Sequence, residues 1–299
     1  PKRKTKISIS PFRPPSSQKS PSNDQSGNTP QASKEPSLKV HSSSKSDRII
    51  SVVKLKAGLN GVWRSAQVTV ANSKSNITYD TGGFAPGLLL QIELHPFEIL
   101  GHPEKWLRNL GTYAEANFFN LETTQLDQEI ESSMARRYEL GVLYRYRLDT
   151  SSFDAQLHAR LGYHHTAFPI ANASFPGTKY HTSALALGYT QSIPNLGFKI
   201  PMVDHLSFSA LVGYNFAVFR SGKLKRLGTS MDGYALDGKF GFYAHRGNLS
   251  LGILWSMNYF STSYQGETTL PRPVQFIDSN LSDSVHHLGL SIGYDFDIL

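Results

Sequence analysis

Charged side chains recur at alternate positions along several segments, and these are the residues that could do chemistry. Glu139, for example, shares its face with Arg145 and Arg147. Opposite charges held close together away from bulk water form ion pairs. We therefore predict a structural ion-pair network, with a selective path for a small polar solute as the alternative. The residues concerned are Glu93, Glu115, Glu139, Arg145, Arg147, Asp154, His158, Arg160, Lys239, His287 and Asp295.

Histidines raise the question of a metal site. His158, His164, His165 and His181 are close in sequence, and a further pair stands at 286–287. A metal site needs three or four converging ligands, and the sequence shows no such convergence, although His158 and His164 share one face. We predict no metal and no cofactor.

Hydrolytic chemistry would need an activated nucleophile. The segment Tyr189–Ser192 and the His164–His165 pair supply hydroxyl and imidazole groups, but no recognisable nucleophile motif surrounds any serine. The chain has no cysteine, which excludes thiol catalysis and disulfides. We predict no catalytic residues and no enzymatic activity. A hydrolase that acts on protein or lipid is kept as an alternative.

The elements that must position these residues are β-strands. In Val285–Leu299, apolar residues from Leu288 to Ile298 take every second position, and small or polar residues lie between them, as in a strand with two unlike faces. The same period predicts nine further strands: Lys54–Val70, Gly87–His95, Leu110–Phe119, Tyr138–Leu148, Phe153–Tyr163, Ser183–Tyr189, Leu206–Val218, Tyr234–Ala244 and Leu249–Tyr259.

The connections between these strands alternate in length, as in an up-and-down barrel with turns at one end and loops at the other. The short or middling connections are Pro96–Asn109, Asp149–Ser152, Ser192–Asp204 and His245–Asn248. The long polar connections are Ala71–Phe84, Asn120–Arg136, Thr166–Lys179, Arg220–Gly233 and Phe260–Ser284.

The first strand decides the strand count. Its apolar residues change from odd to even positions near Asn60–Gly61. This indicates either a hairpin, or a bulge or glycine kink within one strand. One continuous strand gives ten strands with both termini on the short-turn side, whereas a hairpin gives eleven. Because single-chain bacterial barrels have even numbers of strands, we predict about ten. Twelve would result if Leu38–Ser42 or Val274–Ile277 added a strand.

The two strand faces favour a membrane barrel over a soluble one. The non-apolar face is mostly Gly, Ser, Thr, Ala, Asn and His, whereas a solvated face usually carries many Lys and Glu. The apolar face has aliphatic residues in mid-strand and aromatic residues toward the ends, as in interfacial girdles. We therefore predict an all-β, antiparallel transmembrane barrel; a soluble lipocalin-like barrel is the alternative. No apolar run is long enough for a transmembrane helix, and any export signal has been removed from this sequence.

Residues 1–48 differ from the barrel predicted for residues 49–299. Ten basic and three acidic residues give this segment a net charge of +7, which is the formal charge of the whole chain. Ser and Pro are frequent and little apolar surface is available to bury, so we expect a disordered tail. Such a tail would contact a periplasmic protein or peptidoglycan through screened charges. We predict no nucleic-acid binding, because no aromatic platform accompanies the charges.

The end of the chain resembles the C-terminal assembly signal of bacterial outer-membrane proteins. Its matching positions are Ser291, Gly293, Tyr294, Phe296 and Ile298, while Leu299 departs from the usual terminal Phe. Repeated Gly-Tyr pairs resemble those of such barrels, and the general layout is similar to barrels of predatory or myxobacterial type. The resemblance implies location in the bacterial cell outer membrane, recognition by the barrel assembly machinery, and contact with outer-membrane lipid and lipopolysaccharide.

The expected function is therefore that of a Gram-negative outer-membrane barrel, with a structural or narrow, porin-like role and a basic periplasmic tail. One alternative is a membrane anchor subunit of an envelope complex, whose partner the tail recruits. The other is the outer-membrane hydrolase already named.

Overall fold

The computed structural model describes residues 51–70, 76–81, 83–125, 128–149, 154–169, 178–193, 200–220, 228, 230–267 and 277–297. The chain divides into two units, Pro1–Ser46 and Asp47–Leu299. All described residues belong to the second unit, so the predicted disorder of residues 1–48 lies outside them. The strand suggested for Leu38–Ser42 also lies outside them.

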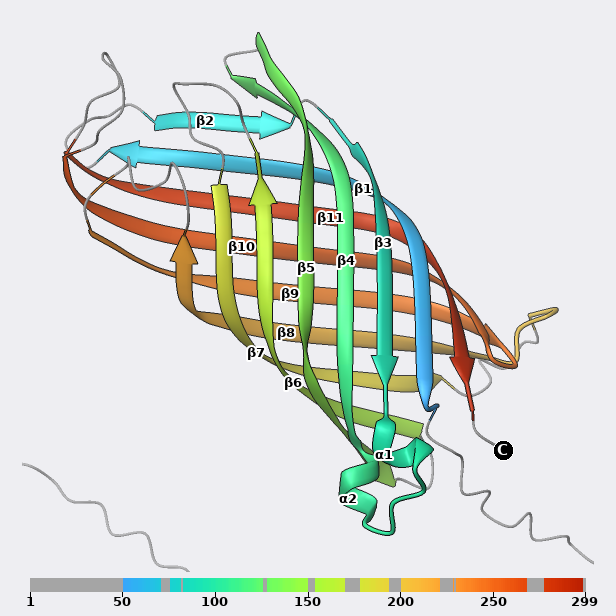
Figure 1. Ribbon diagram of the computed structural model, residues 1–299. Helices are drawn as coiled ribbons and strands as arrows, with labels where there is room; N and C mark the ends of the chain where they lie inside the picture. The colour runs from blue at the N-terminus through green and yellow to red at the C-terminus, as the bar shows by residue number, and fades with distance from the viewer. Residues whose placement is uncertain are drawn as a thin grey trace, which may run out of the picture. The chain divides into compact units, whose positions relative to one another are not determined.

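The described part of the chain consists almost entirely of strands (Figure 1). These are β1 (Val53–Val70), β2 (Asn76–Thr81), β3 (Ala85–Leu94), β4 (Leu110–Gln125), β5 (Gln128–Asp149), β6 (Asp154–Phe168), β7 (Thr178–Ile193), β8 (His205–Arg220), β9 (Ser230–Arg246), β10 (Leu249–Glu267) and β11 (Ile277–Phe296). Two single-turn helices, α1 (Pro96–Ile99) and α2 (Lys105–Arg108), connect β3 to β4.

The sheet closes on itself, because β1 pairs with β11 along its whole length. The antiparallel register runs from Val53↔Phe296 to Val70↔Ser279, and Figure 1 shows the two strands side by side. Consecutive strands from β4 to β11 pair in sequence order. The short β2 and the longer β3 both pair with β1 and β4, at different heights, so they share one place in the wall. The described strands therefore form a closed ten-strand antiparallel barrel, as predicted.

β1 is one continuous strand, and the hairpin alternative is wrong. Its register with β11 passes through Asn60↔Gly289 and Gly61↔Leu288 without a shift, so no bulge is present either. The parity switch has another cause. Leu59 is 72% exposed on the outer face, whereas Val62 is completely buried inside. The strand keeps its geometry while the barrel interior changes from polar to apolar.

Both described ends of the barrel lie at the short-turn rim, where β1 begins and β11 ends. At this rim, β9 and β10 are joined by only two residues, Gly247 and Asn248. The opposite rim is called the loop rim below. Among the described residues, no helix is long and apolar enough to cross a membrane.

The strands extend further toward the loop rim than predicted. The connection predicted for Asn120–Arg136 is wrong, since β4 and β5 remain paired up to Gln125↔Gln128. The connection predicted for Ala71–Phe84 contains β2. Hydrophobic alternation marks only the part of a strand with an apolar face, whereas backbone hydrogen bonds continue the ladder beyond it. Of the segment Val274–Ile277, suggested as an additional strand, residues 274–276 lie outside the described residues, and Ile277 is the first residue of β11.

The strand faces have the predicted orientation, with apolar side chains outside. A belt of exposed aliphatic residues surrounds the barrel: Leu55, Leu59, Leu88, Leu90, Leu140, Val142, Leu157, Leu161, Leu185, Leu187, Val212, Leu236, Leu251, Ile253, Leu290 and Ile292. The buried charged residues, among them Glu115, Arg137 and Asp237, lie inside. A soluble barrel would have the reverse arrangement.

Candidate functional site

The described side chains in the lumen form three layers. We call them the lower layer, which is next to the short-turn rim, the central layer, and the third layer, which is next to the loop rim. Glu93 on β3 accepts a hydrogen bond from Arg145 on β5, and its other oxygen lies 2.6 Å from Nη2 of Arg160 on β6. The Arg160 guanidinium also lies 4.9 Å from the ring centroid of Tyr113. A single carboxylate thus holds two arginines across three strands.

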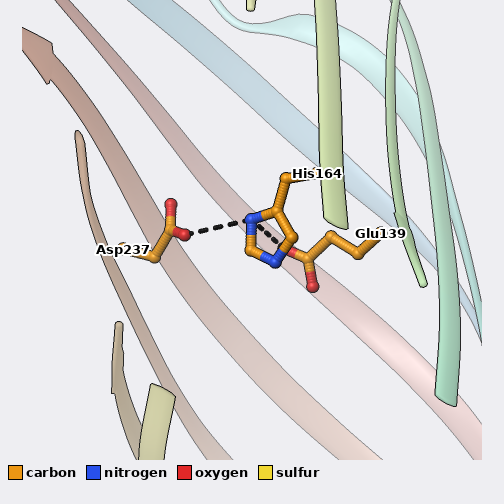
Figure 2. A group of neighbouring side chains, drawn as sticks. All are labelled: Glu139, His164 and Asp237. Carbon is orange, nitrogen blue, oxygen red and sulfur yellow. Dashed lines mark ion pairs between the residues drawn. The ribbon is translucent and has the colours of Figure 1, made fainter. Parts of the chain in front are cut away.

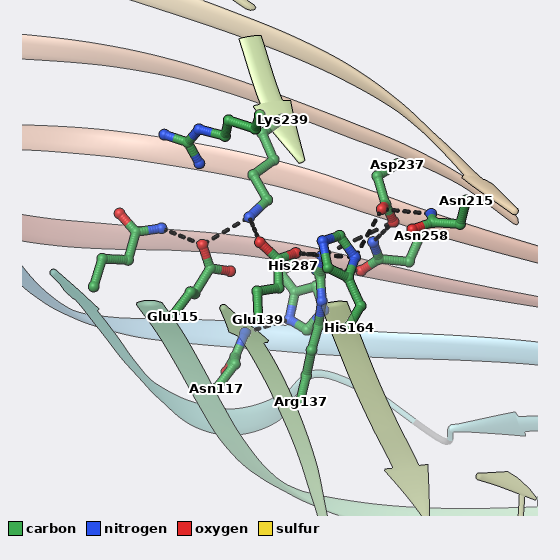
Figure 3. Close-up of polar contacts among 12 residues, drawn as sticks. Glu115, Asn117, Arg137, Glu139, His164, Asn215, Asp237, Lys239, Asn258 and His287 are labelled. Atoms are coloured by element: carbon green, nitrogen blue, oxygen red, sulfur yellow. Dashed lines mark hydrogen bonds and ion pairs between the residues drawn. The ribbon is translucent and has the colours of Figure 1, made fainter. Parts of the chain in front are cut away.

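The central layer is organised around two glutamates that repel each other. Glu115 on β4 and Glu139 on β5 are direct cross-strand partners, an arrangement of like charges that destabilises a sheet. Lys239, which comes from β9 across the lumen, donates to both carboxylates, at 2.7 Å and 3.0 Å (Figure 3). Arg137 also donates to Glu139. The two cations keep the glutamate pair together.

Asp237 and His164 complete the central layer. Nδ1 of His164 lies 3.2 Å from a carboxylate oxygen of Asp237 and 3.6 Å from one of Glu139 (Figure 2). Asn215 donates to Asp237 at 2.6 Å, and Asn258 donates to the other carboxylate oxygen. Three carboxylates in this layer therefore face two cations, Arg137 and Lys239, and the imidazole of His164 lies between two of these carboxylates.

Glu139, His164 and Asp237 also offer ligand-type atoms within 4.8 Å of one another. One nitrogen and two carboxylate oxygens could suit a divalent cation. However, Arg137, Asn215 and Asn258 already donate to these carboxylates. A metal ion would have to displace those donors and would lie beside Arg137 and Lys239. The arrangement therefore suits an ion-pair network better than a metal centre.

The third layer, toward the loop rim, is largely apolar. Tyr180 stacks on Phe260 with ring centroids 4.0 Å apart, and Phe119, Phe168 and Val62 belong to the same buried cluster. Its polar element is a buried bidentate ion pair between Arg64 and Asp283, with distances of 2.9 Å and 2.7 Å. Tyr180 donates to the same aspartate at 3.0 Å. The arginine lies over the Phe168 ring.

These layers leave little free space within the described lumen. A cavity there has a volume of about 10 Å³ and is lined in part by Asn60, Glu115, Asn117, Lys239 and His287. This is room for about one water molecule. Together with the three packed layers, this indicates that the described side chains fill much of the lumen.

The structure gives each of the eleven predicted charged residues a polar partner. Some of these residues belong to neither the lower nor the central layer. Among them, Arg147 pairs with Asp154 at 3.3 Å, and Asp295 pairs with Lys54 at 3.9 Å. His158 contacts Thr190 at 2.9 Å, and His287 contacts Asn117 at 3.2 Å. A role for any of them in selecting a solute stays a prediction.

Several residues of the network were missed by the sequence analysis. Asp237 lies two positions before Lys239 on the same face, so parity alone could have found it. Arg137 and Asp283 fall at or beyond the predicted strand ends, and Arg64 lies past the parity switch. Strand extension, which hydrophobic alternation does not report, hid Arg137 and Asp283, whereas the parity switch within β1 hid Arg64.

A serine–histidine contact occurs near the short-turn rim, which bears on the hydrolase alternative. Ser207 Oγ lies 2.7 Å from Nε2 of His245, whose ring stacks on His205. Among the described residues, no carboxylate hydrogen-bonds the other ring nitrogen of His245. The pair therefore lacks the third group that orients a catalytic base.

The residues of the predicted assembly signal lie on β11. Ser291 is buried inside, whereas Tyr294 and Phe296 are exposed outside with ring centroids 4.6 Å apart. Gly293 is buried, and Ile298 lies outside the described residues. Recognition by the assembly machinery stays a prediction.

No protein-family model matches the sequence, and no curated protein matches it. Solved structures similar to the chain include a deltaS2 mutant of the monoaromatic hydrocarbon channel TodX, with 10% identity, a TM-score of 0.28, and coverage of 83% of this chain and 91% of that one. OprG from Pseudomonas aeruginosa has 11% identity, a TM-score of 0.28, and coverage of 83% and 97%. The β-domain of the Bordetella autotransporter BrkA has 13% identity, a TM-score of 0.33, and coverage of 80% and 99%. Similarities this low assign no function to the chain.

Proposed function

We propose that this protein is an integral β-barrel of the bacterial outer membrane with a closed lumen and a structural rather than conducting role. The observation that carries this proposal is the combination of an apolar exterior with an interior filled by ion pairs and aromatic rings. The apolar exterior supports the membrane location, and the filled interior supports the closed lumen.

The exterior supports insertion into a membrane. Soluble monomers rarely expose contiguous apolar patches larger than a few hundred Å², yet the exposed aliphatic belt occurs on almost every strand of this barrel. An apolar groove of about 810 Å³ is part of the same outer face and is lined in part by Leu55, Ala57, Leu90 and Ala116. Lipid chains would cover this surface. By the rule for bacterial barrels, the short-turn rim would face the periplasm.

The interior supports a closed barrel over a narrow pore. A conducting path needs a continuous polar passage, but the Tyr180–Phe260 stack and its apolar neighbours occupy one layer of the lumen. Below that layer, the carboxylates and cations satisfy one another rather than line a water-filled channel. Breaking such a network exposes uncompensated buried charge, so the closed state is favoured.

Conductance in planar bilayers tests the proposal. The wild-type protein should insert without producing discrete channels. The double variant Tyr180→Ala, Phe260→Ala removes the stacked rings and should conduct more than wild type, while Leu251→Ala on the outer face serves as the control. Reproducible wild-type channels would show that the lumen is a pore. Retention of the wild-type protein in the aqueous fraction after carbonate extraction would refute the membrane location.

Anchoring is a second candidate function, favoured by the placement of β1. Because β1 begins at the short-turn rim, the basic segment of residues 1–48 is joined to the barrel there. The barrel would then be the membrane subunit of an envelope complex, and its basic segment would bind a periplasmic protein or peptidoglycan.

A further inference from the structure

A group of basic side chains lies on the outer face of the barrel near the loop rim. We call Arg136 on β5, His165 on β6, and Lys179 and His181 on β7 the outer basic patch. The register places Arg136 and Lys179 on either side of Ala167, and His165 directly opposite His181. Arg136 and Lys179 are exposed, whereas Ala167 between them is only 2% exposed. The two long basic side chains therefore flank a covered alanine.

Aromatic rings support this patch. The His165 and His181 ring centroids lie 4.5 Å apart, with their Nδ1 atoms separated by 3.3 Å. The Tyr138 and His165 rings stack with their centroids 6.2 Å apart, and the Tyr163 hydroxyl contacts Nδ1 of His181. These contacts fix the positions of the imidazoles on the outer wall.

Within the part of the chain that the structure describes, Arg136 and Lys179 differ from the lumen cations in their surroundings. Among the described side chains of β5, β6 and β7, no aspartate or glutamate faces outward beside the outer basic patch, and neither Arg136 nor Lys179 forms an ion pair with a described residue. Both are close enough to His165 for their charges to act on its imidazole. In the lumen, by contrast, acids balance the cations. Arg136 and Lys179 thus present positive charge on the outer surface of the described barrel.

The position of the outer basic patch indicates the kind of ligand that it could bind. Leu140 and Leu161 of the aliphatic belt lie on the same outer faces and are exposed. Arg136 is four residues from Leu140 along β5, or about 13 Å toward the loop rim. A ligand that reached both would have an anionic head at the level of the patch and apolar chains against the belt.

We propose that the outer basic patch binds the phosphate-bearing headgroup of lipopolysaccharide in the outer leaflet. Arg136 and Lys179 supply the charged donors that phosphate oxygens accept. Tyr138 and Tyr163 lie where aromatic residues border the headgroup region. This inference rests on the proposed membrane location, and it adds a specific lipid site to an otherwise general lipid contact.

The test compares three forms of the protein reconstituted in nanodiscs. The first is wild type; the second is Arg136→Gln, Lys179→Gln. The third is Lys105→Gln, Arg246→Gln, a control that removes two charges at the opposite rim. Binding of fluorescent lipopolysaccharide is measured for each form. Each basic residue near an anionic lipid surface strengthens binding by several-fold, so the patch variant should bind roughly tenfold more weakly, with the control like wild type.

Two further arms identify the ligand without relying on a variant. Wild-type protein should bind dephosphorylated lipopolysaccharide several-fold more weakly than the intact lipid. Inorganic phosphate at equal concentration should not displace the intact lipid; displacement would show a site for free anions and overturn the inference. Equal binding by all three forms, or equal binding of both lipids, would also overturn it. Failure of wild type to enter nanodiscs would instead count against the membrane proposal itself.

Discussion

At the scale of single residues, Lys239 decides whether the lumen network is stable. Glu115 and Glu139 are opposed across β4 and β5 and are both buried. Their mutual repulsion is offset because one ammonium group donates to both carboxylates. Arg137 neutralises only one side of the pair directly, through Glu139.

Replacing Lys239 with methionine should therefore destabilise the barrel strongly. Removing one partner of a buried ion pair typically costs about 3–5 kcal/mol because the remaining charge is left uncompensated. Urea unfolding of the protein in lipid vesicles measures the change in the free energy of unfolding. Lys105→Met on the exposed surface of α2 is the matched control and should change little. Equal stability of the two variants would show that Lys239 does not hold the glutamates together.

His95 follows the last residue of β3 and precedes α1, and its side chain is completely buried. Its backbone N–H donates to Val52 at 2.8 Å, which ties the end of β3 to the start of β1. Burial, assisted by the positive charge of Arg145, lowers the pKa of His95 to about 4. The folded protein therefore favours the neutral imidazole.

This residue should make stability depend on pH. An unfolded histidine binds a proton below about pH 6.5, whereas His95 in the fold does so only near pH 4. Because the unfolded state then binds more protons, stability should fall as pH decreases between these values, by up to about 1.4 kcal/mol per pH unit. Unfolding midpoints at pH 7 and pH 5 should differ less in His95→Gln than in wild type. An identical loss in both proteins would contradict this assignment.

At the scale of elements, one place in the wall is built from two strands. The β1–β3 pairing ends at Val62↔Ala85, and the β1–β2 pairing begins at Ser65↔Asp80. At the gap, the Arg64 N–H donates to the Thr81 hydroxyl at 3.0 Å. Trp63 packs against Phe84 on the outside with ring centroids 5.0 Å apart. A side-chain hydrogen bond and an aromatic contact thus bridge the interrupted ladder.

The β9–β10 turn gives a local prediction. Gly247 has a φ of +55°, and its N–H donates to Asp204 at 2.6 Å. A side chain in this left-handed conformation costs about 1–2 kcal/mol, so Gly247→Ala should lower the unfolding free energy by about that amount. Gly238→Ala on β9 is the control, because a Cβ there would meet no atom within 4 Å. If both variants unfold like wild type, the turn does not require the positive φ.

At the scale of the whole molecule, the barrel closes without residues 1–48. The closing seam pairs Val53–Val70 with β11, and the unit of strands begins at Asp47. The barrel should therefore be an independent folding unit, and the role of the basic segment can be tested separately.

Deleting residues 1–48 should leave the heat-modifiable gel shift of the folded barrel unchanged. If the barrel is the anchor of an envelope complex, the same deletion should abolish the pull-down of a periplasmic partner. A second variant retains the segment but replaces its lysines with glutamine, which separates the effect of charge from that of length. Loss of the gel shift on deletion would show that the barrel needs the segment to fold.

Much of this architecture could be predicted from alternation alone, because a strand's side chains point alternately to two faces. The central parts of the ten wall positions and the outward direction of Leu140 and Leu290 follow from that period. The strand ends near Gln125 and Gln128 do not, since their pairing depends on backbone hydrogen bonds rather than apolar side chains. The short β2 was missed for the same reason.

The sequence by itself determined that the chain forms an antiparallel barrel with an apolar outer face and charges inside. Only the tertiary structure decided which charges meet, because the closed sheet's register brings together residues distant in the chain, such as Arg64 and Asp283, which are 219 positions apart. It also showed that the described side chains pack into three layers across the lumen. The parity switch in β1 is visible in the sequence, but its cause becomes apparent only when Phe119, Phe168, Tyr180 and Phe260 converge from four other strands.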